Sequence, residues 1–336
     1  MRKKSNVFIS FILITISISF SIFGCNGVIK NNDILKVYEV DNTTDNNTYS
    51  LFTSSTLHEI KGFGENMAVI PADFTNPEGV ECTANSVLLF CLDDNEVLYA
   101  QNAHEIMNPA SITKLMTAYL TLKYGNLNDI VTITEASSIT EYGATVLGLK
   151  PGDKISLYDL LACSLIYSAN DAAAAIAIHI SGSIEAFSKL MTDEAHALGA
   201  TNTTFKNPHG LTEEGHLTTA YDTYIILKKC CENETFMSIT NQPEYSCTYT
   251  LADGTSKTKK VQHTLRYHVG KAELTEGVTL LGGKTGTTNA AGHCLSLIIQ
   301  NNTTEKKYIA VLLKAYTRDI LYTEAGHLQE LCANDE

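Results

Sequence analysis

The order of apolar and polar positions predicts strands near both ends of residues 86–332 and helices between them. Short apolar runs bounded by turn residues are typical of strands and occupy 86–92, 97–100, 278–285, 294–300 and 308–315. Apolar positions at helical spacing predict helices over 108–125, 156–167, 171–181, 184–198, 219–231 and 318–332. Two strands at the start and three at the end indicate one antiparallel sheet, assembled from both ends of the chain around a helical insert.

Shorter segments complete this pattern. Residues 130–134 and 145–149 are predicted to be brief extended pieces, and 207–211 is a loop by its composition. Residues 245–259 predict a hairpin, because Thr- and Tyr-rich arms flank an Asp-Gly turn at 253–254. Ser156 is the expected cap of the helix that follows it, with an acidic residue three positions later.

The helix at 108–125 carries the first candidate chemistry. Asn108 is placed to cap it, and Pro109 takes the first helical position, where a missing N–H costs nothing. Ser111 and Lys114 are three residues apart, so on a helix they share a face and their side chains can meet. A serine beside an amine is a nucleophile beside a possible base, provided that burial and the helix dipole keep the lysine neutral.

Short motifs of this kind need structural context, and the chain contains several. Residues 256–259 repeat the Ser-x-x-Lys spacing in a polar stretch that is expected to be an exposed turn. Ser168 and Asn170 form a Ser-x-Asn motif at the break between two buried helices, where Asn170 is either a helix cap or part of a site. Lys284 begins a Lys-Thr-Gly motif at the end of a predicted strand.

Composition and charge narrow the classes of function. The chain has 336 residues, 44% of them hydrophobic, which suffices for one large domain or two. Its formal net charge of −13 argues against nucleic acid as a partner and against broad electrostatic binding to an anionic surface. An anionic ligand would therefore have to be held locally. Nine cysteines are scattered without a CxxC pair or zinc spacing; several are expected to be buried, and their pairing is open.

The N-terminus predicts export. A basic start at residues 2–4 precedes an apolar stretch at 7–23, which together indicate a signal segment over 1–25. Ile22 and Gly24-Cys25 resemble a bacterial lipoprotein cleavage site, although Phe23 departs from the usual small residue; an ordinary cleaved signal and an uncleaved anchor are the alternatives. The polar residues 26–80 are expected to form a flexible tether. All three alternatives place the remainder outside the cytoplasmic membrane.

Three motifs occur in one order: Ser-x-x-Lys at Ser111, Ser-x-Asn at Ser168 and Lys-Thr-Gly at Lys284. Together they resemble the serine penicillin-recognising enzymes, which include penicillin-binding proteins and class A β-lactamases. Over residues 80–335 the chain is similar to the low-molecular-weight D-alanyl-D-alanine carboxypeptidases in four stretches: Pro109-Ala110-Ser111-Ile112-Thr113-Lys114-Leu115-Met116-Thr117, Ser168-Ala169-Asn170-Asp171-Ala172, Asn207-Pro208-His209-Gly210-Leu211, and Lys284-Thr285-Gly286-Thr287-Thr288 with Ala291-Gly292.

This resemblance implies a fold and an activity. The fold is an α/β sandwich, in which a five-stranded antiparallel sheet packs against a helical cluster, here within a catalytic domain at residues 81–336. The activity is that of a serine carboxypeptidase, which removes the terminal D-alanine from peptidoglycan stem peptides through an acyl-enzyme and binds β-lactam antibiotics. No metal or organic cofactor is expected. The bacterial protein would act at the outer face of the membrane or in the cell wall, held by its N-terminal segment or a lipid.

The resemblance also implies catalytic roles for three side chains. Ser111 would attack the carbonyl between two D-alanines, Lys114 would receive its proton, and Ser168 would relay a proton to the leaving amine. Asn170 would hold the substrate's amide backbone and help to position Lys114. Lys284 would face the substrate carboxylate, and its charge would disfavour protonation of Lys114.

The strand after Lys284 is expected to bind the substrate. Thr285 and Thr287 lie on it, and the extended peptide stem could pair with this strand. The backbone N–H groups of Ser111 and Thr287 would form the oxyanion hole. Arg266 and His263 are both candidates for a further contact with the terminal carboxylate, and no spacing argument separates them.

The chain differs from many members of this family in two respects, and two alternative functions are considered. Ala169 stands where many relatives have glycine, and the chain ends soon after the sheet, without a second β-rich domain or C-terminal anchor.

A class A β-lactamase would need a Glu-x-x-Leu-Asn pattern after Ser168, and none occurs. A non-catalytic penicillin-binding sensor is the other alternative. The intact set of five polar side chains argues against it.

Overall fold

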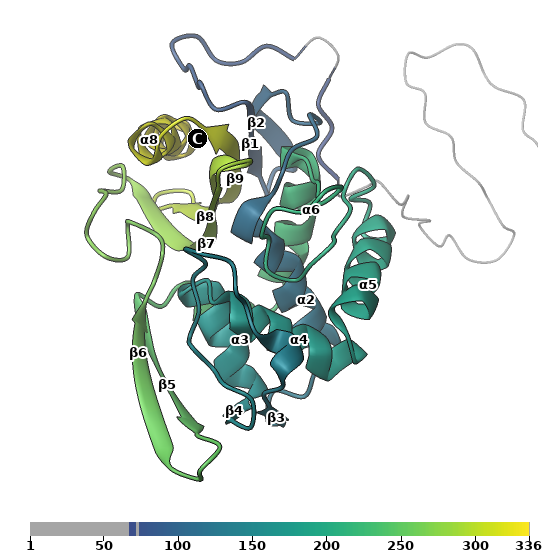
Figure 1. Ribbon diagram of the computed structural model, residues 1–336. Helices are drawn as coiled ribbons and strands as arrows, with labels where there is room; N and C mark the ends of the chain where they lie inside the picture. Colours follow the sequence, from purple (N-terminus) through teal and green to yellow (C-terminus); the bar gives the residue numbers. More distant parts are fainter. Residues whose placement is uncertain (1–66, 72–73, 336) are drawn as a thin grey trace, which may run out of the picture. The chain divides into compact units, whose positions relative to one another are not determined.

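The described part of the chain consists of residues 67–71 and 74–335 of a computed structural model (Figure 1). Contacts divide the chain into two units, Met1–Phe63 and Gly64–Glu336, and the described residues belong to the second. The expected signal segment at 1–25, with Cys25, and the expected tether as far as residue 66 lie outside the described residues. Among those that are described, no helix has both the length and the apolar character needed to cross a membrane.

A five-stranded antiparallel sheet joins the start of the described chain to its end. β1 and β9 pair from Ser86 opposite Leu313 to Cys91 opposite Tyr308, so the first hairpin is built onto the last strands. The strand order is β2-β1-β9-β8-β7, with β1 (Ser86–Cys91), β2 (Glu96–Gln101), β7 (Val278–Thr288), β8 (Gly292–Asn301) and β9 (Lys307–Ala315). This confirms the predicted sheet assembled from both ends.

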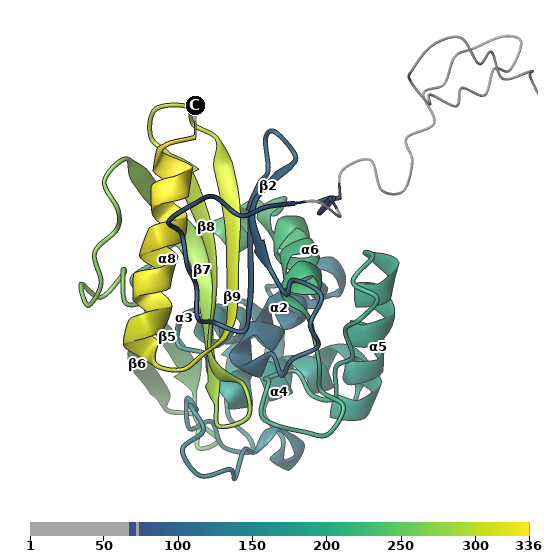
Figure 2. The same cartoon turned by 90° about the horizontal axis from the view of Figure 1, so that it is seen from above.

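Helices cover both faces of this sheet, because successive side chains of its strands are apolar on both sides. On β1, Leu88 and Phe90 enter one hydrophobic cluster, whereas Val87 and Leu89 enter the other. Helix α8 (Arg318–Ala333) packs on the second face, and the other helices gather on the first (Figure 2). These are α2 (Lys114–Tyr124), α3 (Leu157–Ile166), α4 (Asn170–Ser181), α5 (Ile184–Ala197), α6 (Ala220–Cys231) and α7 (Glu234–Thr240). The α/β sandwich is confirmed.

A second sheet holds the predicted hairpin. It has the order β3-β4-β5-β6, with β3 (Ile130–Thr132), β4 (Lys154–Ser156), β5 (Glu244–Thr250) and β6 (Ser256–Gln262). The extended piece predicted at 145–149 is not a strand. The carboxylate of Asp171 accepts hydrogen bonds from the backbone N–H groups of Leu147, Gly148 and Leu149, so the donors that a neighbouring strand would use are occupied.

The helix predicted from Asn108 begins later than expected. Ala110–Thr113 form a 3-10 turn, η1, which leads into α2, and no side chain caps either element. The Asn108 amide instead donates to the carbonyl of His216 (3.2 Å), so the expected cap is wrong. The expected cap of α3 is confirmed, because Ser156 Oγ accepts the N–H of Asp159 (2.9 Å).

Part of the expected tether packs against the folded unit. Ala68 is buried, and its carbonyl accepts a hydrogen bond from the Tyr221 hydroxyl (2.7 Å). The Asn76 side chain bonds both the N–H and the carbonyl of Ala100. The boundary placed at residue 80 therefore moves to before residue 68, because backbone hydrogen bonds and burial hold this segment in place.

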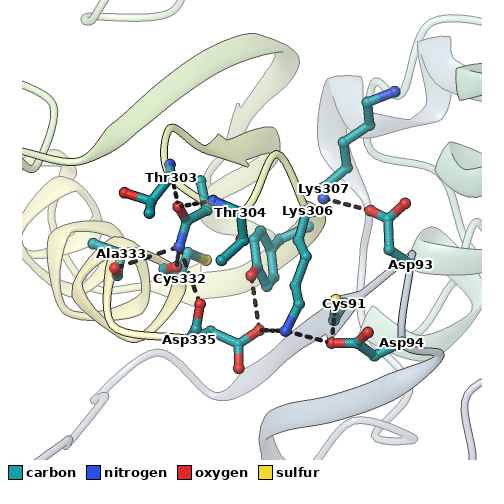
Figure 3. Close-up of polar contacts among 12 residues, drawn as sticks. Cys91, Asp93, Asp94, Thr303, Thr304, Lys306, Lys307, Cys332, Ala333 and Asp335 are labelled. Atoms are coloured by element: carbon teal, nitrogen blue, oxygen red, sulfur yellow. Dashed lines mark hydrogen bonds and ion pairs between the residues drawn. The ribbon is translucent and has the colours of Figure 1, made fainter.

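Charged residues tie the end of α8 to the turns of the sheet (Figure 3). Lys306 Nζ lies 2.8 Å from Asp94 Oδ2 and 3.5 Å from Asp335 Oδ2. Cys91 Sγ and these two carboxylates lie within 4.8 Å of one another, as metal ligands would. Lys306 already supplies a positive charge between the carboxylates, so this cluster is a structural contact.

The cysteines of the described residues carry free thiols. Eight of them are described, and all are buried except Cys231, which is half-buried. Burial raises the pKa of the Cys294 thiol to about 11, which disfavours the reactive thiolate. These cysteines act mainly as small apolar side chains in the two hydrophobic clusters.

Candidate active site

A fully buried lysine amine lies at the centre of the predicted site. Lys114, the first residue of α2, has no exposed surface. Its Nζ lies 3.0 Å from Ser111 Oγ, 2.6 Å from Asn170 Oδ1 and 2.6 Å from the carbonyl oxygen of His209. Asn170 is the first residue of α4, and its side chain does not cap that helix. The alternative in which Asn170 is only a cap is therefore wrong.

The partners of Lys114 suit a neutral amine. Such an amine has two N–H groups and one lone pair, whereas an ammonium group has three donors and no acceptor. The two carbonyl oxygens of Asn170 and His209 can only accept, so they occupy both N–H groups of a neutral amine and leave its lone pair for Ser111. The Ser111 hydroxyl lies 3.0 Å from Lys114 Nζ and also donates weakly to the His209 carbonyl (3.4 Å). Burial and then the charge of Lys284 hold the pKa of Lys114 well below its ordinary value, and Asp171 opposes them. The amine is thus prepared to take a proton from Ser111.

A second buried lysine faces the second predicted serine. Lys284 lies on β7 and has no exposed surface. Its Nζ donates to Ser168 Oγ (3.0 Å) and to the carbonyl of Thr285 (2.9 Å). Burial lowers the pKa of Lys284 to about 7. Its proton occupancy therefore changes near neutral pH, and its positive charge disfavours a second positive charge on Lys114.

Two residues of the site adopt a left-handed backbone conformation that favours glycine. Ala110, which precedes the nucleophile, has φ 47°, and Ser168 has φ 64°. After α3, the Cys163 carbonyl accepts the N–H groups of both Tyr167 and Ala169, which encloses Ser168 in a tight turn. Such strain persists only where surrounding contacts enforce it. The fold here holds a serine, with its hydroxyl toward Lys284, at a position where glycine would be less strained.

The loop at residues 207–211 forms the floor beneath Lys114. The Asn207 side chain accepts the N–H of Gly210 (2.7 Å), and Thr117 Oγ1 donates to the Pro208 carbonyl (2.6 Å). These bonds direct the His209 carbonyl at Lys114. Gly210 has φ 88°, and an added Cβ there would lie 1.9 Å from the Ala110 oxygen. Only glycine allows this loop to approach the nucleophile so closely.

Two of the predicted substrate residues, Thr285 and Thr287, line one cavity with the two serines. Its volume is about 450 Å³, and Ser111, Ser168, Thr285 and Thr287 all line it. Thr285 Oγ1 donates to Thr264 Oγ1 (2.7 Å), while Thr287 is exposed and its Oγ1 lies 3.2 Å from His293 Nδ1. β7 is an edge strand of the sheet, so its free side can pair with an extended peptide.

Basic residues gather at the same cavity in a chain of strongly negative net charge. Arg266, Lys271 and Arg318 line it. The positive charges of Arg318 and Arg266 contribute, after burial, to a lowered pKa of His293, which places both guanidinium groups near the Thr287 end. Sequence analysis missed Arg318. Its only signal was its place at the start of α8, which packs beside the edge of the cavity.

The structure separates the two candidates for the terminal carboxylate. His263 is buried, its Nδ1 accepts the N–H of Leu265 (2.9 Å), and burial lowers its pKa to about 2. It therefore carries no charge at neutral pH. Arg266 also lines the cavity, although its guanidinium already contacts Asp319 (2.5 Å). A guanidinium offers a carboxylate several N–H donors in a fixed geometry, so Arg266 and Arg318 are better suited than His263 to contact a carboxylate.

The repeated Ser-x-x-Lys at 256–259 is not part of this site. It lies on β6, a strand rather than the expected turn, and residues three apart on a strand point to opposite faces. Lys259 Nζ donates to the Leu147 carbonyl (2.8 Å). The structure therefore joins Ser111, Lys114, Ser168, Asn170 and Lys284 in one site and leaves the repeated spacing outside it.

Comparison with known proteins shows which family the chain belongs to. A family model described as D-alanyl-D-alanine carboxypeptidase, peptidase S11, matches residues 72–317. The chain belongs to the D-alanyl-D-alanine carboxypeptidase family. It is similar to the D-alanyl-D-alanine carboxypeptidases DacF of Bacillus subtilis (34% identity over 255 residues) and DacC of Escherichia coli (33% over 270 residues). These alignments cover 74% and 77% of this chain but 62% and 64% of the relatives, so the chain spans less than two thirds of their length.

Solved structures share the fold of this family member. The Streptomyces K15 DD-transpeptidase superposes with a TM-score of 0.69 at 24% identity, covering 77% of this chain and 98% of its own. Penicillin-binding protein D2 of Listeria monocytogenes, in its cefotaxime-bound form, has a TM-score of 0.62 at 26% identity, with 76% and 99% covered. The sheet and helices described above thus have the fold of these two solved structures.

A substitution at Gly210 tests the close approach beneath the nucleophile. We expect Gly210→Ala to destabilise the protein by about 2 kcal/mol more than Gly254→Ala, because its Cβ would overlap the Ala110 carbonyl. Gly254 is the matched control: its φ is also 88°, but an added Cβ there meets nothing within 4 Å. Denaturant unfolding of both variants measures the difference. Equal losses of stability would show that Ala110 does not constrain this loop.

Proposed function

We propose that this protein is a serine D-Ala-D-Ala carboxypeptidase that removes the terminal D-alanine from peptidoglycan stem peptides. The observation that carries the proposal is the buried Lys114 amine, which contacts Ser111 Oγ while Asn170 and His209 occupy its N–H groups. Membership of the D-alanyl-D-alanine carboxypeptidase family supports the substrate class.

Acylation begins with transfer of the Ser111 proton to Lys114. The Ser111 oxygen attacks the carbonyl carbon between the two D-alanines and forms a tetrahedral intermediate. When the C–N bond breaks, Lys114 gives up the proton that it took from Ser111, and a proton reaches the leaving amine through the Ser168 hydroxyl, which Lys284 holds in place (3.0 Å). Lys114 is then neutral again. D-alanine departs and an ester remains on Ser111. Water then hydrolyses the ester, and the hydroxyl is restored.

Substrate binding uses β7 and the basic end of the cavity. The backbone N–H groups of Ser111 and Thr287 stabilise the oxyanion of the tetrahedral intermediate. Gly286 supports this assignment, because an added Cβ there would lie 3.0 Å from the Ser111 nitrogen, so β7 passes directly beside the nucleophile. Thr285, Arg266 and Arg318 line the same cavity and bind the terminal carboxylate, which Lys284 also faces. Asn170 binds the substrate's amide backbone.

The location follows from this substrate class and from the N-terminal sequence. We propose that residues 1–25 direct export, with Cys25 as a lipid attachment point, and that a tether joins them to the packed segment that includes Ala68. The domain from about residue 67 onward would then act on peptidoglycan outside the cytoplasm, anchored to the membrane through its N-terminus. The basic start and apolar stretch at 7–23 support this arrangement.

β-Lactams are expected to acylate the same serine. A β-lactam ring presents a reactive carbonyl to Ser111, and a related penicillin-binding protein of Listeria monocytogenes is known in a cefotaxime-bound form. The absence of a Glu-x-x-Leu-Asn pattern leaves no counterpart to the glutamate that activates water in class A β-lactamases. We therefore expect slow release of the acyl group and reject the β-lactamase alternative.

The direct test combines product release with labelling. Full-length protein is expected to release D-alanine from a diacetylated Lys-D-Ala-D-Ala peptide, and mass spectrometry is expected to find labelled penicillin on Ser111. Ser111→Ala should abolish both, whereas Ser256→Ala, the matched control, should change neither. Labelling of Ser111 without D-alanine release would favour a sensor. Rapid penicillin hydrolysis would favour a β-lactamase.

The pH dependence of acylation tests the electrostatic role of Lys284. Acylation needs neutral Lys114, so its rate falls as pH drops through the pKa of Lys114. Lys284→Gln removes a charge that lowers this pKa, and we expect the acidic limb of the pH profile to move to higher pH by about 1 unit. Lys259→Gln is the control and should leave the limb in place. If the acidic limb of Lys284→Gln stays in place or moves to lower pH, Lys284 does not lower the pKa of Lys114.

A further inference from the structure

A buried chain of hydrogen bonds ends on the carbonyl that precedes the nucleophile. Thr113 Oγ1 donates to the Ala110 oxygen (2.8 Å), and His216 Nε2 lies 2.8 Å from the same Thr113 Oγ1. His216 Nδ1 accepts the backbone N–H of Lys206 (2.9 Å). Both Thr113 and His216 have only 1% of their surface exposed.

These partners determine the direction of every bond in the chain. Because His216 Nδ1 accepts from Lys206, the ring proton of neutral His216 is on Nε2 and is donated to Thr113. The Thr113 hydroxyl, having accepted from His216, donates its own proton to Ala110. Burial lowers the pKa of His216 to about 4, so the ring is neutral at physiological pH. All the donors therefore point toward the Ala110 carbonyl.

The Ala110 carbonyl and the Ser111 N–H belong to the same peptide group. A trans peptide is planar, so a bond that fixes the direction of the carbonyl also fixes the direction of the N–H on the opposite side. Ala110 has φ 47°, a strained conformation for alanine. The contacts of Thr113 and Gly210 with the Ala110 oxygen hold this peptide in place.

The chain also polarises the peptide. Hydrogen bonds that point in one direction strengthen one another, and a carbonyl that accepts a bond makes its own peptide N–H a stronger donor. A threonine that bonds a carbonyl three residues earlier is common as a local structural contact. The contact here differs because a buried histidine donates to the threonine, and because the carbonyl lies on the peptide of the nucleophile.

We propose that Thr113 and His216 are positioning residues that orient and polarise the Ser111 N–H as an oxyanion-hole donor. The proposal rests on the proposed function, since it needs an oxyanion at this N–H. Neither side chain touches substrate. Both act through the Ala110–Ser111 peptide.

Infrared spectroscopy of the acyl-enzyme tests this role. Penicillin labelled with ¹³C at its β-lactam carbonyl gives an ester carbonyl band on Ser111, which lies at low wavenumber when oxyanion-hole donors polarise it. In full-length Thr113→Val, which lacks the hydroxyl, we expect this band to move to higher wavenumber. We also expect acylation at saturating penicillin to slow about tenfold, a part of the ~10²–10³-fold effect of losing a whole oxyanion donor. Thr113→Ser keeps the hydroxyl and should restore both values.

Thr121→Val is the matched control for losing a buried hydroxyl. Thr121 lies on α2, the helix that follows η1, and is fully buried. Its Oγ1 donates to the Thr117 carbonyl (2.7 Å) and not to the peptide of the nucleophile. The ester carbonyl band of acylated Thr121→Val should stay at the wild-type position. His216→Phe gives a second readout that does not need Thr113→Val to fold, because it keeps the Thr113 contact but removes the donation to it. Its band should shift less than that of Thr113→Val.

The outcomes separate this inference from the proposed function. If wild-type protein carries penicillin on Ser111, but neither Thr113→Val nor His216→Phe moves the band or the rate, the positioning role is wrong and the proposed function stands. If Thr121→Val moves the band as much as Thr113→Val, the effect is general loosening and the role is also wrong. If the wild type is not labelled on Ser111, the proposed function fails and this inference fails with it.

Discussion

The proposed chemistry depends on the burial of one lysine amine. A lysine in water is charged at neutral pH, and a charged amine cannot act as a base. The fold removes the amine of Lys114 from water and gives it two carbonyl acceptors and one hydroxyl. Burial makes the larger contribution to its lowered pKa, and the charge of Lys284 adds to it. Ser111 would otherwise be an ordinary hydroxyl at the start of a helix.

Each partner of this amine comes from a different part of the chain. Asn170 is supplied by the break between two buried helices, and His209 by a loop that needs glycine beside it. Lys284, whose charge acts on this amine without a hydrogen bond to it, comes from an edge strand. Strands from both ends of the described chain form the sheet that carries this edge. A local change at Gly210 or in the sheet is therefore expected to alter the chemistry at Ser111, although neither is a reacting group.

Sequence patterns predicted the elements well because the core is regular. The continuous apolar runs of the sheet strands and the nearly apolar sequence of α3 signal their structure directly. The order of the three motifs predicted which side chains meet. Local details were less predictable. Asn108 looks like a cap, yet its amide bonds a distant carbonyl, and residues 145–149 look extended, yet the Asp171 carboxylate holds their backbone.

Other parts of the site have no sequence signal. The acceptor on His209 is a backbone carbonyl, which any residue possesses, and only the folded loop directs it at Lys114. The link from His216 to Thr113 joins residues 103 positions apart, so no local pattern reveals it. Arg318 reaches the cavity because α8 packs on the sheet beside it. Tertiary packing creates all three features.

The protonation state of Lys114 tests the central claim most directly. Protein labelled with ¹³C at the lysine Cε can be titrated by NMR, with Lys114→Arg used to assign the signal. The account predicts a Lys114 signal with the chemical shift of a neutral amine at pH 7. A Lys114 signal that titrates near the ordinary lysine pKa of ~10.4 would contradict it.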